Sequence, residues 1–451
     1  MKSSSATLLS NGAWSLVNQM TRVATLAIVT IALSRHFGPQ RFGSLAFGLA
    51  FVRIFAVIAA FGLDRIVVRH LIEFADASRS ILQAAIRVKF GIALASYATL
   101  LGIVFIIDPH DRLTLAIVVV AGASLLFQSL DVFDFFFQAG NRFRLIFFGR
   151  AVPVLLSTAL KIAAILGDLP LLVFAALETF ETALIAAGLL FVYRKCGVGT
   201  VGNCRKLQVD WGYLLRQGFP LLLGSLAVMI YMRSDILILG KMAGYKAAGI
   251  YSAASQITEA CALFPMAFAP ALFPILVRWR NKGLLFYHQQ FERLFLGAVL
   301  AGAGIATTLA SGAPIIVRLL YGAEYSSAAT ILVIHAWSAI FIYIAIMQSG
   351  YDITEGLTGL AAVRTAVGAA LNIVLNFALI PKYGGAGSAI ATLISQVCSS
   401  FFFNFVHSRT RPIFAMQSNA LLLIPLFRPI LHRLGRGRSA ELSRQFATSS
   451  E

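Results

Sequence analysis

Long apolar stretches separated by short polar segments run along almost the whole 451-residue chain. Each stretch holds about 20 mainly apolar residues, enough for an α-helix to cross a hydrocarbon core of about 30 Å. The pattern predicts an all-α polytopic membrane protein with about 12 transmembrane helices. We place the spans at residues 12–34, 43–63, 84–107, 113–137, 145–166, 169–192, 214–239, 249–276, 294–317, 327–348, 358–380 and 386–407.

A hairpin at residues 231–274 has an equivalent near the N-terminus. Gly244 and Gly249 mark a short polar bend in the hairpin, and Gly38 and Gly43 mark a similar bend 206 residues earlier. Both bends join two apolar stretches. Transporters are often built from internal repeats, with the substrate site where the repeats meet. We therefore expect two six-helix lobes around a central cavity.

The domain boundaries follow from this repeat and from the placement of basic residues. A glycine-rich basic segment separates the two sets of six spans, and a basic tail follows the last span. The tail either lies on the membrane surface as an amphipathic segment or is solvated. The expected divisions are an N-lobe at 1–193, a cytoplasmic linker at 194–213, a C-lobe at 214–407 and a cytoplasmic tail at 408–451.

Composition supports the membrane assignment and limits what the charge can mean. The chain is 59% hydrophobic and only 12% charged, which excludes an ordinary soluble protein. Its net charge of +18 would suit nucleic acid, but most Lys and Arg residues outside the spans lie on one side of the predicted topology. This asymmetry is the positive-inside rule, so we expect both termini in the cytoplasm and no nucleic-acid partner. The first span lacks a signal-peptide cleavage site and should be retained.

Motifs for enzymatic chemistry are not found in the sequence. There is no glycine-rich phosphate loop, HExxH or GxSxG motif, and no segment between spans is long enough to form a catalytic domain. The spacing of the four cysteines does not fit a zinc site. We expect neither an enzyme nor a bound metal or cofactor.

Basic residues deep within spans are the first candidate site. An ionisable side chain near the bilayer centre costs about 2.5–3.5 kcal/mol, so it is expected to line an aqueous cavity or pair with an acid. Lysines and arginines near span ends, such as Arg87 and Lys89, can instead extend to the interface. The deeper residues, which we take as a cationic substrate-binding cavity, are Arg22, Arg53, Arg150, Lys161, Arg233 and Arg364.

Arg22 and Arg53 are the most informative pair. Each lies near the centre of its span, and neither span contains an acidic residue. Arg22 belongs to a polar stripe with Ser15, Asn18 and Thr25, whose 3–4–3 spacing places all four on one helix face. Such a face points to water or to another helix, and the alternative to a cavity is an interhelical hydrogen-bond seam.

Four carboxylates are candidates for ion coupling: Glu178, Glu181, Glu259 and Asp235. Glu178 and Glu181 share one helix face, and like charges in low dielectric raise one pKa, which suits a proton carrier. The alternative is structural neutralisation of a buried cation. We favour that alternative for Asp131 and Asp134 and leave both interpretations open for the glutamates. We expect His335 to be a hydrogen-bonded interior histidine.

A cavity lined by cations indicates an anionic substrate. The guanidinium group of arginine presents a fork of donors that matches phosphate oxygens. A phosphate or pyrophosphate head group is therefore the natural expectation from the residues alone.

Several segments resemble signatures of O-antigen flippases of the Wzx type. The segment LDVFDFFFQA at 130–139 is similar to the span-four signature, and GIYSAA at 249–254, followed by Glu259, Pro265 and Pro274, is similar to the span-eight pattern. YGAEY at 321–325, NIVLN at 372–376 and IPKYG at 380–384 resemble later signatures. The resemblance covers about residues 8–407 and implies membership of the multidrug/oligosaccharidyl-lipid/polysaccharide exporter superfamily.

This resemblance implies a function. The expected cargo is an oligosaccharide on a polyprenyl pyrophosphate, moved from the cytoplasmic to the outer leaflet of the bacterial inner membrane by alternating access during surface polysaccharide biosynthesis. Related flippases of cell-wall precursors use central arginines in their first two helices, and Arg22 and Arg53 occupy similar places. Expected partners are the lipid-linked oligosaccharide, anionic membrane lipids and, as further candidates, other polysaccharide assembly proteins.

Two alternatives stay open at this point. A cation-coupled drug exporter of the same superfamily would be expected to have an acid-dominated cavity. A membrane polysaccharide polymerase would be expected to have a large outer loop, which the sequence lacks.

Overall fold

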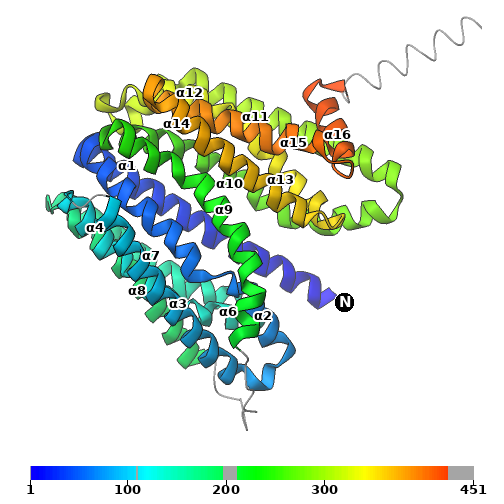
Figure 1. Ribbon diagram of the computed structural model, residues 1–451. Helices are drawn as coiled ribbons and strands as arrows, with labels where there is room; N and C mark the ends of the chain where they lie inside the picture. The colour runs from blue at the N-terminus through cyan, green and yellow to red at the C-terminus, as the bar shows by residue number, and fades with distance from the viewer. Residues whose placement is uncertain (1, 108–109, 197–210, 425–451) are drawn as a thin grey trace, which may run out of the picture. The chain divides into compact units, whose positions relative to one another are not determined.

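The computed structural model describes residues 2–107, 110–196 and 211–424. Within these ranges the regular structure is helical and no strand is present (Figure 1). The α-helices are α1 (Lys2–Ala60), α2 (Leu63–Glu73), α3 (Ser78–Ile107), α4 (Arg112–Gly122), α5 (Ser124–Gln128), α6 (Val132–Ala139), α7 (Phe143–Leu166), α8 (Leu171–Cys196), α9 (Trp211–Ala243), α10 (Tyr245–Asn281), α11 (Leu284–Tyr321), α12 (Ala328–Ala336), α13 (Ser338–Thr354), α14 (Thr358–Val397), α15 (Phe403–Val406) and α16 (Arg411–Leu421). Most of the expected linker and tail lies outside the described residues.

The helices have the length and composition of membrane spans. Among the described residues, eight helical stretches are long and apolar enough to cross a bilayer, or nine when the bent pair α12 and α13 counts as one. Two of these stretches have 57 and 49 residues. At about 1.5 Å per residue, each is too long for a single crossing. Each bends at a glycine with non-helical backbone angles, Gly38 or Gly384, and each contains two of the expected spans.

The expected span at 249–276 lies within α10. Each of the twelve expected stretches falls mainly in one helix or in a run of short consecutive helices. The prediction of an all-α polytopic membrane protein is confirmed.

The two glycine bends share their geometry. Gly38 has a φ of 67° and Gly244 a φ of 85°, a region that glycine adopts without the steric cost of a side chain. Gly43 and Gly249 lie where the two bends meet. A Cβ on Gly43 would be 1.8 Å from the carbonyl oxygen of Tyr245, and a Cβ on Gly249 would be 2.1 Å from that of Pro39. The helix backbones therefore touch at the positions that the repeat predicts to be equivalent.

The chain forms two compact units. Unit 1 comprises Met1–Ile257, Ala313–Leu332 and Ala369–Ala391, and unit 2 comprises Thr258–Gly312, Val333–Gly368 and Thr392–Glu451. All of the expected N-lobe belongs to unit 1, together with parts of the expected C-lobe. The compact units thus follow a different division from the expected lobes, whose boundaries stay a prediction.

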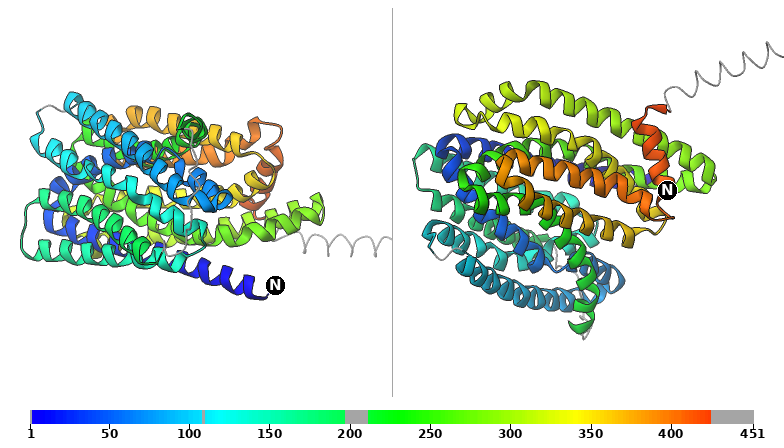
Figure 2. Two further views of the ribbon diagram at one scale, coloured as in Figure 1. Left: turned by 90° about the horizontal axis from the view of Figure 1, so that it is seen from below. Right: turned by 45° about the horizontal axis from the view of Figure 1, so that its top comes forward.

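In unit 1, the short helix α2 anchors one end of the helix bundle. Its sequence LDRIVVRHLIE alternates apolar and charged residues with helical spacing, and Leu63, Ile66, Val67 and Leu71 are buried. These side chains form a core with Val132 and neighbouring residues of α3 and α6. The charged residues of α2 lie on its exposed side. Elsewhere in the unit, α7 packs along α8 (Figure 2).

In unit 2, helix α16 packs against the membrane helices. Its residues Ile413 and Met416 join a core that includes Phe291 and Tyr343. Its fully buried Gln417 donates a hydrogen bond to Gln348 of α13. The first part of the expected tail is therefore an integral helix of this unit.

Candidate functional site

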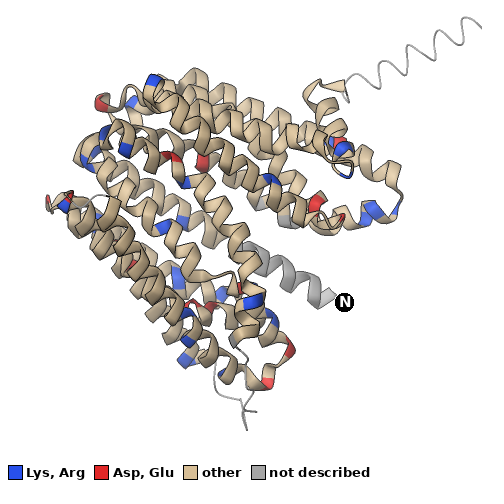
Figure 3. Cartoon of the chain, in the orientation of Figure 1, with Lys and Arg blue, Asp and Glu red and all other residues tan. Residues whose placement is uncertain are grey.

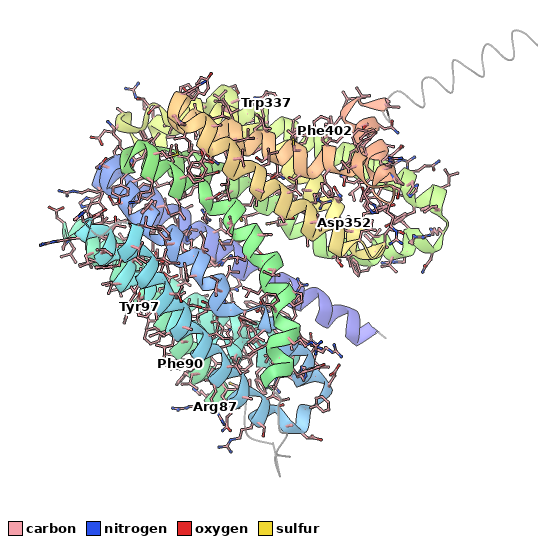
Figure 4. All side chains as sticks on the ribbon, in the orientation of Figure 1. Arg87, Phe90, Tyr97, Trp337, Asp352 and Phe402 are labelled. Carbon is pink, nitrogen blue, oxygen red and sulfur yellow. The ribbon has the colours of Figure 1, made fainter. Side chains whose placement is uncertain are left out.

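Charged residues are sparse along the helices, and many of them lie near helix ends (Figure 3). The deep cations are the exceptions, and Arg150, Lys161 and Arg364 among them have carboxylate partners. Arg150 pairs with Asp134, and its Nη2 is 3.8 Å from Asp131. Arg364 Nη2 lies 3.0 Å from Asp352, the residue of α13 labelled in Figure 4.

Lys161 has the most complete set of partners. Lys161 lies on α7 and is 4% exposed, and its Nζ lies 2.9 Å from Glu178 Oε1 and 2.7 Å from Glu181 Oε2 on α8. The hydroxyl of Ser157 donates a further hydrogen bond of 2.8 Å to Glu181. The i, i+3 spacing that places both glutamates on one face of α8 thus serves to hold a lysine of the neighbouring helix. This geometry supports the structural interpretation of the two glutamates.

Arg22 differs from these paired cations. It is exposed on α1, and it makes no hydrogen bond or ion pair with any side chain that the structure describes. Arg150 and Glu181 are near enough for their charges to act on it. In its polar stripe, the hydroxyl of Thr25 bonds to the backbone of α1 itself, and Ser15 lies outside the described side chains. Arg22 therefore offers its donors to the space beside the helix.

The other candidate residues are spread along the chain. Arg53 is half-buried in the second arm of α1, beyond the Gly38 bend, and Arg233 is buried in α9. Glu259 is half-buried in α10 and belongs to unit 2. Arg22, Arg53, Arg150, Lys161 and Arg233 belong to unit 1, and Arg364 belongs to unit 2.

Asp235 lies in a buried polar cluster of unit 1. Its carboxylate accepts hydrogen bonds from the hydroxyl of Tyr251, at 2.5 Å, and from the amide of Asn376, at 2.7 Å. Ser388 donates to Asn376 at 2.7 Å, and Asn376 also donates to the side chain of Asn372. The cluster gathers carboxylate, amide and hydroxyl oxygens from α9, α10 and α14, which are the ligand atoms that hard cations prefer.

His335 has the environment expected from the sequence. It is 6% exposed in unit 2, and its Nδ1 lies 2.8 Å from the hydroxyl of Thr258. Among the described residues, no group of three or more His, Cys, Asp or Glu side chains could hold a metal ion.

A cavity of about 690 Å³ lies within unit 1 and reveals a residue that the sequence interpretation missed. Its walls come mainly from α2, α3, α6 and α7, with single residues of α1 and α5 and of the turn before α6, and they include Lys89, Asp131 and Arg150. Lys89 is 2% exposed, so the expectation that it extends to the interface is wrong. Its ammonium group instead lies over the ring of Phe135, 4.8 Å from the centroid. In the structure Lys89 shares the buried face of α3 with Ala85 and Ala93, and its position near a span end does not tell which face packs inward.

The polysaccharide biosynthesis protein family matches residues 8–279, which is more than half of the chain. The chain belongs to the polysaccharide biosynthesis protein family. AglR of Haloferax volcanii, a probable flippase, is 26% identical over 391 residues, covering 84% of this chain and 79% of the relative. Agl15 of the same organism, a probable low-salt glycan biosynthesis flippase, is 27% identical over 177 residues, which cover 38% of this chain and only 36% of that relative.

Solved structures of other proteins have the same fold as this chain. The lipid II flippase MurJ, in an inward closed conformation, superposes with a TM-score of 0.67 at 13% identity, covering 93% of this chain and 92% of MurJ. An inward-facing multidrug resistance transporter of the MATE family and MOP superfamily gives a TM-score of 0.63, also at 13% identity, covering 88% and 99%. At these identities the likeness concerns the fold alone. The family match and the shared fold confirm the predicted superfamily.

Proposed function

We propose that this protein is a flippase for a polyprenyl-pyrophosphate-linked oligosaccharide. It moves its cargo from the cytoplasmic to the outer leaflet of a bacterial inner membrane by alternating access, as a step of O-antigen or similar surface polysaccharide biosynthesis. Both termini are then cytoplasmic, and other polysaccharide assembly proteins and anionic lipids are its proposed partners. The family and the flippase names of AglR and Agl15 support this proposal.

The observation that carries the proposal is the exposure of Arg22 on a membrane-spanning helix. A guanidinium group at this depth is costly unless acceptors satisfy its five donors. A pyrophosphate that leaves the interface loses hydration, and charge-assisted hydrogen bonds to arginine replace it. Arg53, in the antiparallel second arm of α1, is the proposed second member of this clamp. Arg150, Lys161 and Arg233 of the same unit, and Arg364 of unit 2, stay candidates for contact with the anionic head group from their positions in the sequence. Arg150, Lys161 and Arg364 have carboxylate partners.

Contacts within unit 1 support alternating access. At the end of the bundle that holds Gly38 and Gly244, helices of the two expected lobes are joined by hydrogen bonds. Tyr325 donates from its hydroxyl to the carbonyl of Ser34 at 3.1 Å, and Arg35 donates to the carbonyl of Leu319 at 2.9 Å. Under the proposed topology this is the outer end. In the proposed alternating-access cycle, these bonds break when cargo leaves outward.

The four candidate carboxylates differ in how well they suit ion coupling. Glu178 and Glu181 already hold Lys161, so an incoming cation would have to compete with an ammonium group. The carboxylate of Asp235 accepts hydrogen bonds from a hydroxyl and an amide, and these two neighbours could rearrange around a small cation or respond to a proton. We therefore propose Asp235 as the principal coupling residue. Glu259 stays a candidate from its position in α10.

Drug export is the second candidate function, because MATE transporters share the fold. A cationic drug would be repelled by the exposed Arg22, whereas a pyrophosphate would be attracted. The exposed arginine thus favours the anionic cargo. No observation in the described residues favours a polysaccharide polymerase.

Substitution of Arg22 tests the proposal. Arg22→Ala should lower transport of a fluorescent polyprenyl-pyrophosphate saccharide in proteoliposomes by at least tenfold, because the clamp loses its charge-assisted bonds. Arg22→Lys should restore transport only in part, since lysine keeps the charge but loses the bidentate fork. Arg87→Ala is the matched control, because Arg87 lies exposed on α3 (Figure 4). Full transport by an Arg22→Ala/Arg53→Ala variant at normal abundance would refute the clamp.

A further inference from the structure

The cavity between α2, α3, α6 and α7 has the features of a binding site. Its volume of about 690 Å³ lies within the range of about 300–1,000 Å³ that small-molecule sites occupy. Exposed charged residues of α2, including Asp64 and Arg65, form its rim. Buried groups, including Lys89 and Asp134, form its floor. Exposed charged residues at the rim together with buried polar groups at the floor are unusual inside a bundle of apolar helices.

Two donors on the wall lack acceptors within the described part of the chain. Lys89 forms no hydrogen bond or ion pair there, and its contact is with the face of Phe135. The Nε of Arg150 is also buried without a hydrogen-bond partner, although its Nη2 binds Asp134. The Nε of Arg150 is fully enclosed, and a buried donor left without an acceptor is destabilising. A ligand that brings acceptors would remove this cost.

The acidic residues on the wall define the ligand further. Asp64, Glu73, Asp131 and Asp134 all line the cavity. Four basic residues, Arg65, Arg69, Lys89 and Arg150, line the cavity as well, so its wall has no net formal charge and favours neither a compact anion nor a bare cation. Asp134 already accepts from Arg150 and Gln138, and Glu73 accepts from Arg69. Asp131 can still take donors, and Lys89 and the Nε of Arg150 can still take acceptors. Hydroxyl groups provide both. The amides of Gln128 and Gln138 on the same wall also suit hydroxyl groups. The chemistry therefore fits a polyhydroxylated ligand, that is, a sugar.

The cavity is next to the proposed pyrophosphate site. Arg150 lies on its wall, and the charges of Arg150 and Arg22 are close enough to interact. Helix α1, which carries Arg22, packs against α7, which carries Arg150. A sugar linked directly to a pyrophosphate held at Arg22 would therefore lie close to the Arg150 wall of this cavity. We infer that the cavity binds the first sugar of the lipid-linked substrate, an inference that rests on the proposed function.

Binding of two defined lipids to the purified full chain tests this inference. The probes are a polyprenyl pyrophosphate and the same lipid carrying one N-acetylglucosamine, with affinities measured by native mass spectrometry in competition. The wild type should prefer the glycosylated lipid by about tenfold or more, as a few new hydrogen bonds would give. Lys89→Met should reduce this preference to nearly one without changing the affinity for the bare lipid. Gln128→Leu, which removes no charge, should reduce it in part.

Controls separate this inference from the proposed function. Arg87→Met, two residues away on α3 and exposed, should keep the wild-type preference. If neither lipid binds the wild type, the proposed function fails. If both lipids bind equally well, the function stands and the sugar site is refuted. A wild-type preference that survives in both Lys89→Met and Gln128→Leu would also refute it. Gln128→Leu keeps the test decisive if Lys89→Met does not fold.

Discussion

Two buried lysines in the same unit show how differently the fold treats a cation. Lys161 and Lys89 are 4% and 2% exposed, on α7 and α3. The ammonium group of Lys161 lies within 2.9 Å of two carboxylates. That of Lys89 faces an aromatic ring and a cavity, with no ion pair among the described residues. One cation is neutralised by the fold, and the other is left for a ligand.

The comparison teaches that depth in a span is a poor guide to role. Burying either ammonium group costs desolvation free energy, which can be offset either by protein carboxylates or by a bound molecule. Sequence position marked Lys161 as a binding residue and Lys89 as peripheral. The partners that surround each residue reverse that order. The same distinction separates Arg22 from Arg150 and Arg364.

Removing Lys161 should give the largest effect. Lys161→Met leaves the half-buried carboxylates of Glu178 and Glu181 without their counter-ion. Breaking a fully buried ion pair on one side costs about 3–5 kcal/mol, and the partial exposure of these carboxylates lowers that cost. We expect the variant to lose most of its folded protein, as measured by abundance in the membrane and by thermal stability in detergent. A triple variant that adds Glu178→Gln and Glu181→Gln should recover abundance, because no unpaired charge is left. A stable Lys161→Met variant would contradict the structural role.

Neutralising the two glutamates alone would make Lys161 resemble Lys89. Glu178→Gln/Glu181→Gln should lower abundance by a smaller factor, since glutamine can still accept hydrogen bonds from the lysine. The protein that remains should keep the dependence of its transport on an imposed ion gradient. Asp235→Asn should lose that dependence. The measurement is transport in vesicles with and without the gradient, and the opposite pattern would return coupling to the glutamates.

The smallest effect is expected at Asp111, a partnered carboxylate outside the spans. Burial alone would raise the pKa of Asp111, but hydrogen bonds from Thr114 and from the hydroxyl of Tyr245, at 2.6 Å, lower the pKa below its ordinary value. A lowered pKa in the folded state means that the stabilisation is present at neutral pH. It is lost only as the pH falls below about 3.9 and through the folded pKa.

The measurement is thermal stability between about pH 6 and about pH 3. The extra stability of the wild type relative to Asp111→Asn should disappear only at the acidic end. Because Asp111 is partly exposed, water screens its interactions and the difference should be small beside that of Lys161→Met. Parallel pH profiles for the two proteins would show that Asp111 contributes nothing through its charge.

Much of the fold follows from the sequence because lipid imposes strict rules. Backbone groups in a bilayer must be bonded within their own segment, so long apolar runs become helices. The bend at Gly38 could be predicted for the same reason, since glycine interrupts such a run. In α1 two of the expected spans form one long element, and this does not change the prediction that both are helical.

The candidate site was less predictable. The glutamates 178 and 181 could be placed on one face of α8, but which cation they hold depends on how α7 packs against α8. Lys89 was placed at the interface because distance from a span end says nothing about which side of the helix packs inward. The contact of α16 with Gln348 joins distant parts of the chain and has no local signal.

The contact between Gly43 and Gly249 has a consequence for how the two repeats are related. A residue that touches its own counterpart lies at an axis of two-fold symmetry, as in the isologous interface of a homodimer. The two glycine bends therefore meet as the same segment of two copies of one subunit would. A larger side chain at either position would collide with the other half, while residues away from the axis are free to diverge. This constraint explains why the two repeats match at these glycines although their charged residues differ.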